Sequence, residues 1–301
     1  MSESRIDSAV SLEAARPLRW FVPALLILAV LLSTACSGPK KKEKLANRLV
    51  RGDVTTDELF NRATTLFQKR KFVDARRWLR VIEAHAPDSS VFPDVKLAIA
   101  DSYFFDKMAT YIEASVEYKS FLTHFPTHKK ADYAQYQYAM CFFTEIENAD
   151  RDQTSTFTAY TEFKNLIDRH PNSPYAGKAK EKIDLCLLRL AEHEFTVGYY
   201  YFRRGRGFEK SAESRLKGII NNYEGQYDPE KTYFFLAETL WRREKFKEAI
   251  FYYQNLARNY AESEYMPFVQ DKLARWERIK EEGQDPGEIT AEVPSDPLNT
   301  F

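Results

Sequence analysis

The sequence predicts an all-α fold, an α-solenoid of about five helix pairs over residues 53–280. Three observations support this prediction. An alanine recurs five times, apolar residues follow each alanine after four and after seven positions, and a proline follows the first three after twelve. Because an α-helix turns once in 3.6 residues, offsets of four and seven place side chains on one helical face. The pattern therefore predicts one kind of helix five times.

The first 35 residues have the pattern of a secretory signal peptide. Arg16 and Arg19 precede an apolar run over residues 20–32, and small residues at 33–35 lead into Cys36. This arrangement resembles the bacterial lipobox, which implies that Cys36 carries a diacylglyceride and an N-acyl chain. Ser33 departs from the lipobox, which usually has an aliphatic residue there. The alternative is an uncleaved membrane anchor, although a spanning helix needs roughly 20 apolar residues.

Residues 36–52 are predicted to form a lipidated, flexible tether. Ser37, Gly38 and Pro39 precede the charged residues 40–44, and neither stretch can pack in a core. Stable anchoring takes more than one acyl chain, at about 0.8 kcal/mol per buried CH₂. Bacterial lipoproteins retained at the inner membrane commonly have an aspartate at the place of Ser37. Resemblance to this sorting rule implies an anchor in the outer membrane, on its periplasmic face.

The second helix of each pair is marked by one of the anchor alanines, which are Ala75, Ala114, Ala159, Ala212 and Ala249. Four positions later come Leu79, Tyr118, Phe163, Leu216 and Tyr253, and seven positions later come Ile82, Phe121, Leu166, Ile219 and Leu256. A side chain as small as alanine lets a neighbouring helix approach closely. Pro87, Pro126 and Pro171 are expected to end the first three of these helices, because proline cannot extend the hydrogen-bond ladder.

The first helix of a pair lies upstream of its anchor alanine. Leu59, Ala63 and Leu66 precede Ala75, and Tyr233, Ala237 and Leu240 precede Ala249 by the same 16, 12 and 9 positions. Ala98, Ser102 and Phe105 stand in this relation to Ala114. The pattern is that of tetratricopeptide (TPR) repeats, which have an ideal period of 34 residues. The anchors are 39, 45, 53 and 37 residues apart, which predicts insertions at 147–155 and a long helix near 174–202.

Residues 281–301 are predicted to form a flexible acidic tail. From Gly283 onward, three of five residues are proline or glycine. The segment also contains Asp285, Glu288, Glu292 and Asp296 but no basic residue, and it lacks a hydrophobic period.

The composition argues against nucleic acid as a partner. The chain has 44 basic and 44 acidic residues, and this balance persists when residues 1–35 are removed. A neutral protein has no general attraction for a polyanion. Cys141 and Cys186 lie among apolar neighbours and are expected to be buried free thiols, although a disulfide between them stays possible.

The sequence contains no pattern that predicts an enzyme or a metal site. His85, His124 and His170 each lie just before a proline, where a helix ends, so capping is the preferred interpretation. His193 and Glu194 start like a zinc-protease motif, but Val197 stands where the second histidine is needed. No glycine-rich phosphate loop or nucleophile elbow occurs.

The signal, the repeats and the central segments together resemble the BamD family, the TPR lipoproteins of the outer-membrane β-barrel assembly machine. The specific stretches are residues 150–152, 159–183 and 190–223, with a His-Pro-Asn-Ser-Pro-Tyr turn at 170–175 and an Arg-Gly turn at 204–205. The resemblance implies a scaffold and client-docking subunit. It implies contact with a BamA-like barrel subunit, with other lipoproteins of the machine and with unfolded barrel clients.

Two candidate binding surfaces follow. Arg203, Arg204 and Arg206 suit carboxylates on a partner, because guanidinium groups donate in a planar, bidentate fork; the alternative is a solvated turn after a long helix. By resemblance, Arg204 faces the last periplasmic domain of the barrel subunit. Phe60, Phe67, Ile99 and Tyr103 are expected to line a concave groove; the alternative is packing between helices. The resemblance implies that this groove receives the clients' C-terminal strand.

The predicted function is therefore outer-membrane β-barrel assembly and insertion. A second interpretation remains open, namely a TPR lipoprotein that recruits periplasmic cell-wall enzymes.

Overall fold

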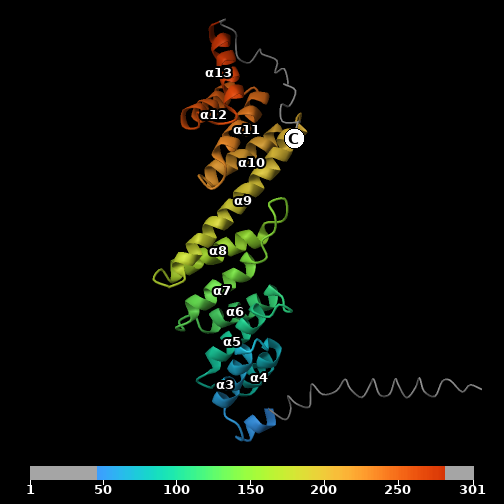
Figure 1. The fold of residues 1–301 in the computed structure, drawn as a ribbon, viewed down its shortest axis with the longest axis vertical. Helices are drawn as coiled ribbons and strands as arrows, with labels where there is room; N and C mark the ends of the chain where they lie inside the picture. Colours follow the sequence, from blue (N-terminus) through green and yellow to red (C-terminus); the bar gives the residue numbers. More distant parts are fainter. Residues whose placement is uncertain (1–45, 282–301) are drawn as a thin grey trace, which may run out of the picture.

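A computed structural model describes residues 46–281 as helices joined by short connections (Figure 1). The helices are α3 (Thr56–Gln68), α4 (Phe72–His85), α5 (Phe92–Phe104), α6 (Tyr111–His124), α7 (Ala131–Phe143), α8 (Thr154–Arg169), α9 (Ala176–Arg204), α10 (Glu209–Asn222), α11 (Pro229–Arg242), α12 (Phe246–Asn259) and α13 (Met266–Glu281). The predicted signal peptide, Cys36 and residues 282–301 lie outside the described residues.

The helices pack in sequence order as five pairs, from α3/α4 to α11/α12, and α13 covers the last pair. Figure 1 shows them stacked along one long axis, with α3 and α13 at opposite ends. Four clusters of buried side chains follow one another along the stack. Helices α5, α7 and α9 each contribute to two successive clusters. The predicted all-α solenoid of TPR-like pairs is confirmed.

The anchor alanines are completely buried, all five at 0% exposure. The apolar residues four and seven positions later are at most 3% exposed. The period in the sequence therefore identified the buried face of every second helix. Alanine stands at the anchor position because the neighbouring helix leaves room there only for a methyl group.

Every second helix ends in the same backbone geometry. The C-cap residues Ala86, Phe125 and His170 have φ between −142° and −131° and ψ between 55° and 61°, and each precedes a predicted terminating proline. Tyr223 and Tyr260 have nearly the same geometry with no proline after them. Each of the five carbonyls accepts a hydrogen bond from the amide three residues on. The turn therefore forms without proline. In the first three pairs the proline reinforces the turn, because the residue before a proline disfavours the helical conformation.

The first and last pairs share a tight connection within the pair. Arg70 and Glu244 have φ of 57° and 60°, and each follows the C-cap of a first helix. The amides of Lys71 and Lys245 donate to Leu66 and Leu240, which makes both connections Schellman motifs. Both connections are three residues long, whereas the connection between α5 and α6 has six.

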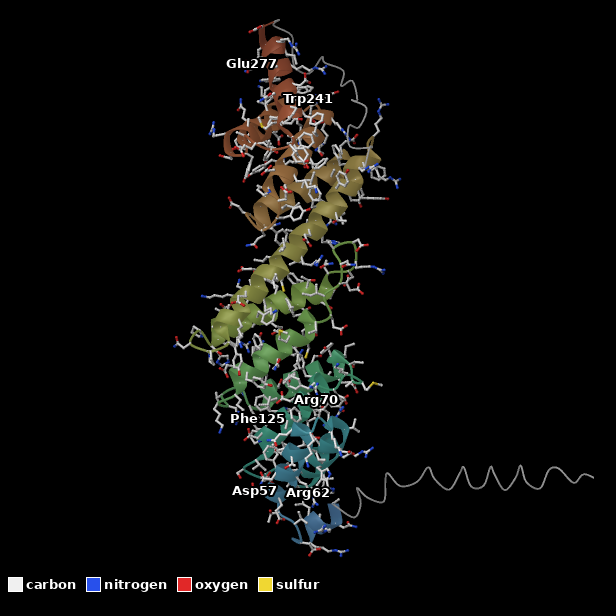
Figure 2. All side chains as sticks on the ribbon, in the orientation of Figure 1. Asp57, Arg62, Arg70, Phe125, Trp241 and Glu277 are labelled. Carbon is white, nitrogen blue, oxygen red and sulfur yellow. The ribbon has the colours of Figure 1, made fainter. Side chains whose placement is uncertain are left out.

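Helix α9 joins the two halves of the stack. Its 29 residues span about 43 Å at 1.5 Å per residue. Its first half packs in a cluster with α7 and α8, and its second half packs with α10 to α13. Trp241 lies in this last cluster, near the α13 end of the molecule (Figure 2). The predicted long helix is confirmed, and His193 on it donates to the carbonyl of Ala149 at 2.7 Å, in the connection before α8.

The end of the predicted tether differs from expectation. Residues 46–50 form a short helix, and Ala46 and Leu49 pack against the first buried cluster. Because these two residues are three positions apart, they lie on the same face of the short helix and can both contact the cluster. Among residues 46–281, no helix combines the length and the apolar character that crossing a membrane requires.

Candidate protein-binding surfaces

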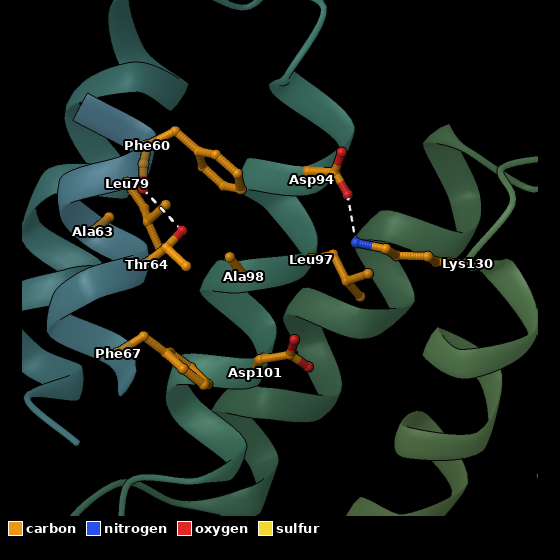
Figure 3. Close-up of a pocket in the computed structure, with 10 residues that line it drawn as sticks. All are labelled: Phe60, Ala63, Thr64, Phe67, Leu79, Asp94, Leu97, Ala98, Asp101 and Lys130. Atoms are coloured by element: carbon orange, nitrogen blue, oxygen red, sulfur yellow. Dashed lines mark hydrogen bonds and ion pairs between the residues drawn. The ribbon is translucent and has the colours of Figure 1, made fainter. Parts of the chain in front are cut away.

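A small cavity opens between α3 and α5 in the N-terminal part of the stack. Its volume is about 180 Å³. Figure 3 shows Phe60 and Phe67 reaching from α3 toward α5, with Asp94 and Lys130 on the other side. We call this space the client cavity, after the prediction that Phe60 and Phe67 bind clients; it is lined by Phe60, Ala63, Thr64, Phe67, Leu79, Asp94, Leu97, Ala98, Asp101 and Lys130.

The two phenylalanines are held by their own helix and by aromatic neighbours. Phe60, Thr64 and Phe67 are spaced by four and three residues, so they share one face of α3. The Phe67 ring packs edge-to-face on Phe72 and Phe105, with centroids 5.0 Å and 6.0 Å away. Phe60 and Phe67 are both half-buried, which leaves part of each ring open to a ligand.

The far wall of the client cavity carries charge. Nζ of Lys130 lies 2.8 Å from Oδ1 of Asp94. The same carboxylate oxygen of Asp101 accepts hydrogen bonds from the hydroxyls of Tyr118 at 2.6 Å and Tyr133 at 2.9 Å. Burial raises the pKa of Asp101 to about 6, and the tyrosine hydrogen bonds and Lys130 oppose this rise. The cavity thus combines apolar rings with a carboxyl group that titrates near neutrality.

Only two of the four residues predicted for the groove line this cavity. The prediction for Ile99 is wrong, because its side chain is fully buried between helices with Leu59 and Ile82. Tyr103 does not line the cavity; the guanidinium of Arg76 lies 3.7 Å from its ring centroid. The longer connection between α5 and α6 explains the error. The prediction counted the same number of residues back from Ala114 as from Ala75, but the connection before Ala114 is three residues longer, so the positions assigned to α5 were shifted by about three residues relative to α3.

Sequence reasoning did not name Asp94, Asp101 or Lys130. They come from α5 and from the residue before α7, so no single helical period relates them to Phe60 and Phe67. A partial signal existed, because Asp94 and Asp101 are seven residues apart and share one face of α5.

The second candidate surface lies where α9 turns into α10. Gly205 and Gly207 have φ of 69° and 90°, which glycine adopts without steric cost. Arg203, Arg204 and Arg206 are all exposed on this turn. We call residues 203–208 the arginine turn. The structure therefore brings the three predicted arginines onto one exposed turn.

Aromatic rings position Arg204. Its Nη1 donates to the hydroxyl of Tyr200 at 2.9 Å, and its guanidinium lies 4.7 Å from the ring centroid of Phe208. Tyr200 is 54% exposed and was not named from the sequence, although four residues separate it from Arg204 on the same helix. Beneath the turn, Nη1 of Arg242 donates to the carbonyl of Phe202 at 3.0 Å. An arginine held against rings presents its remaining N–H groups in a defined direction.

The remaining candidate residues, His124, Cys141 and Cys186, make contacts within the fold. Nδ1 of His124 donates to the carbonyl of Ser120 at 2.7 Å, four residues earlier in α6, so this histidine is bonded within its own helix. Cys141 and Cys186 are buried free thiols, as expected, and burial raises the pKa of both to about 12. Within residues 46–281, no group of histidine, cysteine and acidic side chains could hold a metal ion.

Comparison with known proteins covers most of the chain. The profile of the YfiO family, described as outer membrane lipoprotein, matches residues 52–243. A Rickettsia prowazekii protein named outer membrane protein assembly factor BamD is 28% identical over 82% of this chain and 93% of its own length. The proteins of the same name from Caulobacter vibrioides and Haemophilus influenzae are 27% and 26% identical. They cover 72% and 73% of this chain, and 69% and 82% of their own lengths.

Proposed function

The chain belongs to the YfiO family of outer membrane lipoproteins, and we propose that it is a scaffold and client-docking subunit in outer-membrane β-barrel assembly and insertion. Its relatives are named for outer membrane protein assembly. The role requires the protein to hold other proteins in place and requires no catalytic step.

The client cavity is the observation that carries the client-docking part of the proposal. Two half-buried phenylalanine rings flank a space of about 180 Å³ between two first helices. An aromatic side chain at the end of a client strand could enter it and bury apolar area at roughly 25 cal/mol per Å². The clients are unfolded outer-membrane barrels with such a C-terminal strand.

The client-docking part predicts that Phe67→Ala weakens binding of a fluorescent peptide from the C-terminal strand of a barrel protein. The expected loss is about tenfold in Kd, or about 1.4 kcal/mol, measured by fluorescence anisotropy with the full-length protein in detergent. Phe157→Ala is the matched control, because Phe157 is an exposed phenylalanine on α8 outside the cavity. Equal affinity of the two variants would contradict client docking at this cavity.

The arginine turn carries the partner-binding part of the proposal. Arg204 and Arg206 are exposed, and a guanidinium group can donate two parallel hydrogen bonds to a carboxylate. The proposed partner is a BamA-like barrel subunit, which binds through its periplasmic domains, and other lipoproteins of the machine join the same complex.

This part predicts that Arg204→Glu sharply reduces co-purification of the barrel subunit with the intact lipidated protein. Arg258→Glu is the control, because Arg258 is an exposed arginine in the last turn of α12. Unchanged recovery of the barrel subunit with Arg204→Glu would refute the partner site. Recovery of a peptidoglycan hydrolase in place of a barrel subunit would support the cell-wall adaptor instead.

The proposal includes a lipid anchor on Cys36 that holds the protein at the periplasmic face of the outer membrane. The description of the family as outer membrane lipoprotein supports it. Mass spectrometry of the mature N-terminus should find Cys36 as the first residue, with its acyl chains, despite Ser33.

A further inference from the structure

A second cavity lies on the surface between two of the connections that join successive helix pairs. These connections run from α6 to α7 and from α8 to α9, and they lie on the same side of the stack (Figure 1). The cavity has a volume of about 440 Å³, more than twice that of the client cavity. We call the space between residues 126–132 and 169–174 the turn pocket.

Two of the side chains that line the turn pocket are cations without a partner. Lys129 comes from the connection after α6 and Arg169 from the last turn of α8, and both are exposed. Among residues 46–281, neither side chain forms an ion pair or a hydrogen bond. Arg80 and Arg243, by contrast, are paired with carboxylates of their own chain. Lys129 and Arg169 are therefore both available to an anion from outside.

Among the described residues that line the turn pocket, only Asp132 is acidic, and both of its oxygens are already used. Oδ2 accepts from Oγ of Ser173 at 2.8 Å, and Oδ1 accepts from the amide of Tyr133 at 2.7 Å. The Ser173 bond also ties the two connections together. The amide of Lys130 donates to Nδ1 of His128 at 3.2 Å, which leaves the proton of the neutral ring on Nε2 as a donor. The pocket thus offers mainly cations and donors to a ligand.

The surface beside the turn pocket is also basic. Residues 169–180 contain Arg169, Lys178 and Lys180 but no acidic residue. Lys178 and Lys180 are exposed at the start of α9, whose first turn carries no acidic side chain. A helix N-terminus has a partial positive charge, so it adds to the same field. A ligand in the pocket therefore meets an excess of positive charge on its α9 side.

The size and the surroundings of the turn pocket indicate which kind of anion fits. Ligand pockets have volumes of roughly 300–1,000 Å³, so a compact ion such as phosphate would leave most of this space unfilled. Binding to a lipid surface needs apolar side chains that enter the membrane beside the cations. No large apolar side chain is exposed at residues 117–156 or 158–184. A peptide with several carboxylates therefore fits better than a phosphate ion or a lipid headgroup.

We propose that the turn pocket docks an acidic segment of a partner protein, with Arg169 and Lys129 each bound to a carboxylate. A guanidinium group can hold a carboxylate through two parallel hydrogen bonds, whereas an ammonium group acts as a point charge. Pro126, Pro171 and Pro174 fix φ in both connections, so the pocket is preorganised for binding. This site is additional to the arginine turn, and the proposal does not depend on the role of that turn.

The test uses the full-length protein in detergent and a hexaglutamate peptide with a fluorescent label. Its Kd, measured by fluorescence anisotropy, should rise about tenfold when Lys129→Ala and Arg169→Ala are combined, because two charge-assisted contacts are lost. Both residues are exposed and unpaired, so the double variant should keep the native melting temperature. Arg258→Ala is the matched control, because Arg258 is exposed in the last turn of α12, outside the pocket. Equal Kd values for the double variant and the control would overturn the proposal.

A second measurement locates the bound peptide. Hexaglutamate with an N-terminal benzophenone should form adducts with residues 126–132 or 169–174, identified by mass spectrometry, and Arg204→Ala should leave their yield unchanged. Adducts confined to residues 203–208 would overturn this proposal and support the arginine turn as the site for carboxylates. Displacement of the peptide by inorganic phosphate or glycerophosphoglycerol, beyond the effect of NaCl at equal ionic strength, would also overturn it, because the pocket would then hold a phosphate or a lipid headgroup.

Discussion

At the scale of single residues, Asp101 has the most unusual environment of the client cavity. Its carboxyl group lies between two tyrosine hydroxyls and is desolvated by the surrounding helices. A carboxylate held in this way costs free energy whenever it is charged, because the surrounding protein replaces its water less well than bulk solvent does.

The raised pKa of Asp101 predicts a particular dependence of stability on pH. The folded protein takes up a proton near pH 6, whereas the unfolded chain takes it up near 3.8. The folded state therefore binds more protons between these values, and this group stabilises the protein as the pH falls from 7 to 4. One pKa unit corresponds to about 1.36 kcal/mol, so the contribution is at most about 3 kcal/mol.

The measurement compares the denaturant midpoint at pH 5 and pH 7.5 in the native protein and in Asp101→Asn. The variant should lose the part of the difference that comes from this carboxyl group. Asp184→Asn, which changes an exposed residue of α9, should retain it. If Asp101→Asn had the same pH dependence as the native protein, a desolvated Asp101 would be ruled out.

At the scale of helices, neighbouring helices approach each other closely where one of them has alanine or glycine. The anchor alanines allow this in every second helix, and Gly198 allows it between α9 and α10. A Cβ atom at Gly198 would lie 3.1 Å from Cγ of Leu216 and 3.2 Å from Cβ of Arg215. The α9–α10 interface therefore has no room for a methyl group at this position unless its neighbours move.

Gly198→Ala is predicted to destabilise the protein by about 1–3 kcal/mol, the usual cost of overpacking. Gly177 offers a control in the same helix, because nothing lies within 4 Å of a Cβ atom placed there. Gly177→Ala should raise stability by up to about 1 kcal/mol through the better helix propensity of alanine. Thermal melts of both variants check this, and a stabilising Gly198→Ala would show that α9 and α10 separate freely.

Helix ends show what a local pattern can and cannot predict. Prolines correctly indicated where α4, α6 and α8 end. The absence of proline after α10 and α12 gave no sign that these helices end in the same turn, because that turn depends on hydrogen bonds to its own backbone. The registers of α3 and α5 could not be compared from sequence, since the lengths of the connections were unknown.

At the scale of the whole molecule, each helix pair contacts mainly its neighbours. Phe235 packs with Phe195, Phe202 and Tyr265 in the cluster of α9 to α13, whereas Leu59 lies in the cluster of α3 to α5. In a solenoid, stability is close to a sum of repeat terms and interfaces between neighbours. A defect in one cluster should therefore stay in its part of the stack.

Phe235→Ala is predicted to cost about 3–5 kcal/mol and to speed hydrogen exchange in α10 to α13, with little change in α3 to α6. Leu59→Ala should have the reverse distribution. Hydrogen exchange read by mass spectrometry distinguishes the regions. Equal acceleration along the whole chain in both variants would show a single cooperative unit.

The sequence by itself determined the helix pairs, the buried face of each second helix and the long α9, because a helical face depends only on spacing along the chain. It also named Phe60 and Phe67, which line the cavity, and three arginines, which are exposed; their binding roles stay predictions. Only the tertiary structure decided that Ile99 is buried, that Asp101 and Lys130 complete the client cavity, and that Tyr200 and Phe208 hold Arg204. These features depend on contacts between helices. Such contacts depend on the relative register of the helices, which is set by the lengths of their connections, and connection lengths leave no periodic signal in the sequence.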